Sequence, residues 1–105
     1  MPTKVVFRKF KEGDIIALFP RLPGTNDPYT CGSYMHIGQH GSTDPGIVNI
    51  TELAKPTEYA SLAKELRSIG YVLDIKSKIT YDDMLYRKKL VNLFRKKLIN
   101  KIRGK

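Results

Sequence analysis

One stretch of thirteen residues gathers most of the side chains that could carry chemistry. Tyr29–Gly41 contains the only cysteine, both histidines and two of the six tyrosines. An imidazole exchanges its proton near neutral pH, so His36 is a candidate acid, base or hydrogen-bond donor. Tyr34 adds an aromatic ring for stacking and a hydroxyl group. If the chain has a small-ligand or enzymatic site, we expect it in this stretch.

Alternation along the predicted strand 29–37 divides these residues between two faces. Cys31, Ser33, Met35 and Ile37 share a mostly apolar face that we expect to look into the core, with Cys31 as a buried small hydrophobe. The opposite face and the following turn hold the candidate ligand-site residues, which are Tyr34, His36, Gln39 and His40. The alternative interpretation is a sheet surface where Tyr34 and His36 pack beneath another element.

The other patterns argue against a catalytic centre. The spacing Cys31-x4-His36-x3-His40 supplies three ligands where structural zinc takes four, and strand parity turns Cys31 away from His36. No glycine-rich phosphate loop is present. The adjacent carboxylates Asp82 and Asp83 stand at a predicted helix start, where the helix dipole explains them. The sequence therefore predicts no catalytic residues, no metal and no cofactor, and favours a binding protein over an enzyme.

The net charge of +9 is concentrated at one end of the chain. Residues 1–86 hold ten basic and ten acidic side chains, whereas residues 87–105 hold nine basic side chains and no acidic one. The candidate anion-binding residues in this segment are Arg87, Lys88, Lys89, Arg95, Lys96, Lys97, Lys101 and Arg103.

A basic amphipathic helix of this kind has three common roles. It neutralises nucleic-acid phosphates, lies on an anionic membrane surface, or packs its apolar seam on protein while the cations are merely solvated. The helix forgoes the salt bridges between residues four apart that acidic side chains would provide. This favours an anionic partner, either nucleic acid or an acidic protein surface.

The chain as a whole predicts an α+β fold with the order β-β-β-(β)-α-β-α. The expected strands span residues 4–10, 14–19, 29–37, 47–51 and 71–76, with residues 38–46 as a loop. One helix is expected from Pro56 to the stop signal at Gly70, with an apolar stripe that includes Leu62, Ala63 and Leu66. A Thr80-x-x-Asp83 cap begins a second helix from Tyr81 to about Arg103.

These elements predict a mostly antiparallel sheet of four or five strands with the first helix packed across one face. Residues 1–78 form the expected core domain and residues 79–105 the basic helix. The second helix either crosses the sheet or projects, in which case its apolar seam would allow a homodimer. With one cysteine, no signal-peptide pattern in residues 1–11 and no run of about 18 apolar residues, we expect a cytoplasmic protein without a transmembrane segment.

Several separated motifs occur in an order that resembles a known family. They are Val6-Phe7-Arg8, residues 16–20, the Ser33–Gly41 motif Ser-Tyr-x-His-x-Gly-Gln-His-Gly, residues 56–59 and residues 65–71. Over about residues 5–76 the chain resembles a family of small uncharacterised proteins of bacteriophages and mobile elements. The resemblance implies an accessory protein in a host cell, and implies no catalytic role.

Three functions are therefore expected, in decreasing order. The first is a non-catalytic module that binds nucleic acid or another anionic surface through the basic helix. The second is an inhibitor or effector that binds a host protein. The third is a small-ligand or enzyme site at Tyr34, His36 and His40.

Overall fold

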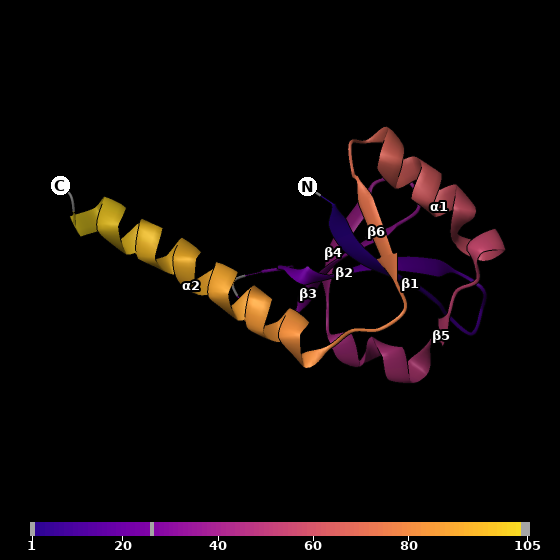
Figure 1. Cartoon of the computed structure of the whole chain (residues 1–105), viewed down its shortest axis with the longest axis horizontal. Coiled ribbons are helices and arrows are strands. Elements are labelled where there is room, and N and C mark those ends of the chain that lie inside the picture. The colour runs from indigo at the N-terminus through magenta and orange to yellow at the C-terminus, as the bar shows by residue number, and fades with distance from the viewer. Residues whose placement is uncertain (1, 26, 104–105) are drawn as a thin grey trace.

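The computed structural model describes residues 2–25 and 27–103, and these residues form one sheet with two α-helices (Figure 1). The strands are β1 (Thr3–Lys9), β2 (Ile15–Pro23), β3 (Cys31–Met35), β4 (Gln39–Thr43), β5 (Glu52–Leu53) and β6 (Leu73–Lys76). The helices are α1 (Pro56–Ser68), α2 (Tyr81–Arg103) and the short 3-10 helix η1 (Pro45–Ile50). The predicted α+β class is confirmed.

The sheet is antiparallel along the order β4-β3-β2-β1-β5, and β6 joins β1 as its parallel neighbour. Strand β1 is therefore central: β2 runs along one side, while β5 and β6 share the other. The chain passes through α1 between β5, which is antiparallel to β1, and β6, which is parallel to β1. Gly70, with a φ of 109°, closes α1 as the sequence predicts.

Both faces of the sheet are covered. Helix α1 packs Leu62, Ala63 and Leu66 on one face, as predicted, against a cluster that includes Phe7 and Tyr34. The other face carries Ile16, Leu18 and Cys31 beneath partly buried side chains such as Ile47 and Val48 of η1. Cys31 is fully buried, as predicted, and burial raises the pKa of its thiol to about 11. The thiol is therefore protonated and inert near neutral pH.

Three sequence predictions about the strands are wrong. Pro20 does not end the second strand, because β2 continues to Pro23 through an irregular register opposite β3, where the missing N–H of proline is tolerated. Residues 39–43, predicted as loop, form the edge strand β4. Strand parity alone could not find β4, since most of its side chains are exposed and polar.

The predicted strand at 47–51 is instead the helix η1. Asp44 caps this helix by accepting a hydrogen bond from the backbone N–H of Gly46, and Pro45 suits its first turn. Arg8 of β1 then donates to the backbone carbonyls of Val48 and Thr51, which fixes η1 against the sheet.

Helix α2 has the predicted bounds and projects from the body (Figure 1). Its first turns pack on β2, where Asp83, Arg87 and Val91 are buried. From residue 92 to residue 101 every side chain is exposed, and the molecule measures 52 × 29 × 21 Å. Among the described residues, no helix is long and apolar enough to cross a membrane.

Candidate functional site

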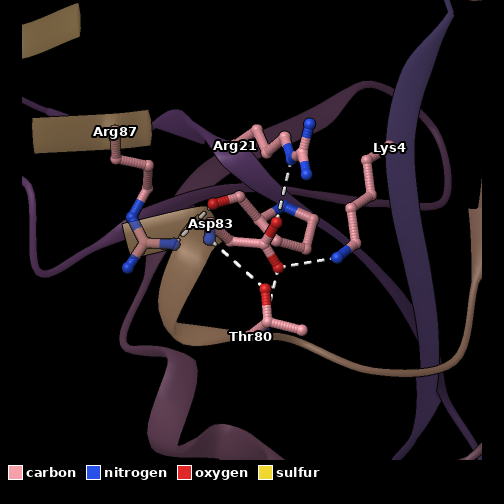
Figure 2. Close-up of polar contacts among 6 residues, drawn as sticks. Lys4, Arg21, Thr80, Asp83 and Arg87 are labelled. Carbon is pink, nitrogen blue, oxygen red and sulfur yellow. Dashed lines mark hydrogen bonds and ion pairs between the residues drawn. The ribbon is translucent and has the colours of Figure 1, made fainter. Parts of the chain in front are cut away.

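The root of α2 is built around one buried carboxylate (Figure 2). The Asp83 side chain is 0% exposed, and it lies 2.7 Å from Lys4 Nζ of β1 and 2.9 Å from Arg21 Nε of β2. The backbone N–H of Thr80 donates to the same carboxylate at 2.8 Å, and Thr80 Oγ1 accepts from the backbone of Asp83. The predicted cap therefore also joins the helix to two strands.

Opposing effects set the ionisation of Asp83. Burial raises the pKa of the carboxyl group, but the hydrogen bonds from Lys4, Thr80 and Arg21 lower it by more, so the pKa lies below its ordinary value. The carboxylate is therefore charged near neutral pH. It balances one of the two cations that contact it, and one positive charge is left over at this end of the sheet.

Arg87 does not belong to the anion-binding surface that the sequence predicts. Its side chain is 2% exposed, with Nε donating to the carbonyl of Pro28 at 2.9 Å and Nη1 donating to the carbonyl of Pro20. Pro20 lies in the irregular part of β2, so its carbonyl is open to this contact. Arg87 therefore anchors α2 and is not accessible to a phosphate.

The cations of α2 from Lys88 to Lys101 are exposed. Within the described part of the chain, α2 has no acidic residue after Asp83. Its exposed basic side chains are Lys88, Lys89, Arg95, Lys96, Lys97 and Lys101. The side chain of Arg103, also predicted to bind anions, lies outside the described residues. The projecting half of α2 is thus a positively charged arm about 20 Å long from residue 88 to residue 101.

A groove of about 600 Å³ lies beside the root of α2. Its walls come from β1, β2, the β6–α2 connection and the first turns of the helix, and we call it the root groove. Its lining residues are Pro2, Thr3, Lys4, Arg21, Leu22, Asp74, Lys76, Ser77, Lys78, Thr80 and Tyr86. Four of these are cations and one is a carboxylate. The Tyr86 ring is 48% exposed and lies under the guanidinium of Arg21, 5.4 Å from its carbon.

The candidate residues of the hairpin β3–β4 form a different kind of cluster, centred on Glu65 of α1. Tyr34 is 2% exposed and donates its hydroxyl to Glu65, while His36 Nδ1 lies 2.6 Å from Glu65 Oε1. The backbone N–H of Ile37 donates to Glu65 at 2.9 Å, and that of Gly38 donates to the Tyr34 hydroxyl. The carboxylate therefore clamps the turn to α1.

This arrangement overturns two expectations for the hairpin. The Tyr34 ring is unavailable for stacking with a base or ligand, because α1 covers its face of the sheet and His40 packs on it edge-on at 4.6 Å. The strand ends at Met35, so Ile37 is not on a core face but in the turn, where it is 79% exposed with a φ of 61°. The alternative of Tyr34 packing beneath another element is the one observed.

The rest of this candidate site stays dispersed. His36 is 64% exposed, and Gln39 and His40 are exposed on the edge strand β4. A shallow hollow includes Tyr34, Gly38 and His40 with residues 69–71. Among the residues that the structure describes, no three of His, Cys, Asp and Glu gather to hold a metal ion.

The chain was compared with protein families, curated proteins and solved structures. No protein-family model matches the chain, and searches of curated proteins and of solved structures return no match. The resemblance to phage proteins stays a prediction.

Sequence reasoning missed the root groove, although a signal for its central residue was present. Asp83 and Arg87 stand at helical spacing from Val91, Phe94 and Leu98, so they belong to the apolar seam of α2. Charged residues that continue an apolar seam face the protein, and they need partners there. Lys4 and Arg21, by contrast, carry no local signal, because only the folded sheet brings them to Asp83.

Proposed function

We propose that this protein is a non-catalytic nucleic-acid-binding module, with the projecting arm of α2 as its main contact. The observation that carries the proposal is the arm itself: six exposed basic side chains from Lys88 to Lys101, on a helix without an acid after Asp83. An arm with this charge gains from phosphates by releasing their counterions. On the sequence resemblance alone, we assign the module to accessory proteins of phages and mobile elements.

The docking of α2 supports this function by fixing the base of the arm on the sheet. Asp83, Arg87 and Val91 fix the first turns on β2, so the distal turns extend from a stable base. A helix in its final conformation has less entropy to lose on binding than a disordered basic tail. Arg95 and Lys96 lie about 10.5 Å along the helix from Lys88 and Lys89, so the arm presents pairs of cations at two levels.

The test compares two variants with equal net charge. Lys88→Gln/Lys89→Gln/Lys96→Gln removes three charges from the arm, and Lys11→Gln/Lys64→Gln/Arg67→Gln removes three exposed charges from the β1–β2 turn and α1. Binding of labelled DNA is measured by fluorescence anisotropy over a series of salt concentrations. For duplex DNA, we expect the arm variant to lower the slope of log K against log salt by up to about 2.7. The control variant should leave the slope near that of the unsubstituted protein.

Two results would contradict the proposal. One is an affinity for nucleic acid that does not depend on salt, and the other is an equal loss of affinity in both variants. Equal loss would mean that only total charge matters and that the arm has no special role.

A second function is favoured by the apolar residues exposed on the same arm. Leu93, Phe94, Leu98 and Ile99 are each about half exposed or more, and phosphates would not cover them. A host protein with an apolar groove and an acidic rim would cover both kinds of side chain. Phe94→Ser/Leu98→Ser should then abolish capture of one defined partner from nuclease-treated lysate, while DNA affinity stays unchanged. Retained capture by this variant would exclude the second function.

A further inference from the structure

The root groove combines the two features that a nucleotide requires of its binding site. Its lining cations are Lys4, Arg21, Lys76 and Lys78, and the carboxylates that oppose them are Asp74 in the wall, Asp83 behind it and Asp82, which also acts on Arg21. Four positive charges against three negative charges leave a local excess of one. Its volume of about 600 Å³ is within the usual range for a small-ligand site.

The second feature is the exposed ring of Tyr86 beside these cations. Arg21 lies over this ring at 5.4 Å, and Arg21 is itself held by Asp83 at 2.9 Å, so the buried carboxylate positions the guanidinium that orients the ring. Leu22 adds an apolar surface to the same wall, and Thr3, Ser77 and Thr80 add hydroxyl groups. Aromatic rings flanked by cations are the usual platforms for unpaired bases.

The ring also stands in line with the arm. Tyr86, Lys89, Leu93 and Lys96 follow one another at three- or four-residue spacing, and Lys97 comes four residues after Leu93, so they lie along one side of α2. A strand that begins in the root groove can therefore continue along the arm, with its phosphates beside Lys89 and Lys96. The groove and the arm form one continuous path.

We propose that the root groove binds a nucleotide of single-stranded nucleic acid, with its base stacked on Tyr86 and its phosphate between Lys76, Lys78 and Arg21. This inference rests on the proposed function and makes it specific for single strands. Bases in a duplex are stacked on one another, so they cannot offer a face to a ring in a groove wall. The arm alone would bind duplex and single strand by charge.

The test uses a labelled 15-nucleotide oligothymidine and a 15-base-pair duplex. Tyr86→Leu removes the ring but keeps an apolar side chain, and Tyr86→Phe keeps the ring. We expect Tyr86→Leu to weaken single-strand binding about tenfold or more, with little change in the salt slope, because stacking carries no charge. Duplex binding should stay the same, and Tyr86→Phe should bind both nucleic acids like the unsubstituted protein.

A second variant tests the groove without touching its ring. Lys76→Gln/Lys78→Gln replaces two exposed side chains, one at the end of β6 and one in the β6–α2 connection, and should lower the single-strand salt slope by up to about 1.4 while the duplex slope is kept. Inorganic phosphate, added at constant ionic strength, should compete only weakly with the oligothymidine. Strong competition would mean that the groove is a plain anion site, which would overturn the inference.

The outcomes separate this inference from the proposed function. If Tyr86→Leu weakens neither nucleic acid, or weakens both equally, the groove is not a single-strand site, although the arm variant can still show that the module binds nucleic acid. If the unsubstituted protein binds neither oligonucleotide, both proposals fail. Circular dichroism of each variant at the assay temperature establishes that a loss of binding is not a loss of fold.

Discussion

Two carboxylates at opposite ends of the sheet do the same mechanical task with different partners. Glu65 ties α1 to the β3–β4 hairpin, and Asp83 ties α2 to β1 and β2. Each accepts hydrogen bonds from side chains and from a backbone N–H group. Each has a pKa below its ordinary value: for Glu65 the largest cause is the hydrogen bond from Tyr34, and for Asp83 donors outweigh the effect of burial.

The difference lies in the charge of the donors. Glu65 contacts the Tyr34 hydroxyl, the backbone N–H of Ile37 and the His36 imidazole, and these contacts hold the β3–β4 turn on α1. Asp83 pairs with both Lys4 and Arg21, so two positive charges face its single negative charge. Two further cations, Lys76 and Lys78, line the groove beside them. In the hairpin, Tyr34 is buried and Tyr34 and His36 both contact Glu65, so their polar groups serve to hold the turn on α1. The surplus charge, and hence the site that we propose for binding, is at the other end.

Removing the charge of Asp83 is the strongest way to break this comparison. Asp83→Asn leaves Lys4 and Arg21 without their counter-charge at a site where the carboxylate is fully buried. We expect the free energy of unfolding to fall by about 3 kcal/mol or more. Urea denaturation followed by circular dichroism measures it. Asp82→Asn, at the exposed neighbour, is the matched control and should change stability little.

Protonation of Asp83 at low pH should also destabilise the folded protein. Since the folded-state pKa of Asp83 is depressed, its contribution to stability is full well above its ordinary value of 3.8, and is lost as the pH falls through that value toward the lower folded-state pKa. Thermal melts from pH 6 down to about pH 2 should therefore show a steep loss of stability below about pH 4. This loss should be shallower in Asp83→Asn; an identical pH profile would contradict the role given to the carboxylate.

The hairpin clamp should matter less. Tyr34→Phe removes the donor to Glu65 and the acceptor for the N–H of Gly38, without changing the packing of the ring. We expect the melting temperature to fall by about 5 °C, measured by calorimetry. Tyr29→Phe, at an exposed ring, is the control and should melt like the unsubstituted protein. Equal melting of Tyr34→Phe would mean that the clamp adds no stability.

The smallest expected effect is a gain in stability at the turn that Glu65 clamps. Ile37 is β-branched and has a φ of 61°, a region that asparagine enters more readily. Ile37→Asn should therefore raise the free energy of unfolding by about 1 kcal/mol. Ile50→Asn removes a similarly exposed apolar side chain and should be neutral within about 0.5 kcal/mol. A destabilised Ile37→Asn would show that the turn is not strained.

Periodicity and local signals were enough to predict most of the framework. The stripe Leu62, Ala63 and Leu66 placed α1, and the Thr80–Asp83 cap together with the seam placed α2 with its observed bounds. Such features depend on neighbours three or four residues apart, so the sequence contains them directly. The edge strand β4 was missed because it forms by backbone pairing with β3, which its own side chains do not signal. The helix η1 was missed because it is held by Arg8, which is distant in sequence.

The sequence by itself determined the fold class, the two helices, the burial of Cys31 and the concentration of charge after residue 86. Tertiary structure alone decided which polar side chains stay accessible. It buried Tyr34 and Arg87 and left Tyr86 exposed beside Arg21. The physical reason is that accessibility and charge pairing depend on contacts between segments remote along the chain: Lys4, Arg21 and Asp83 meet only after β1, β2 and α2 have packed together.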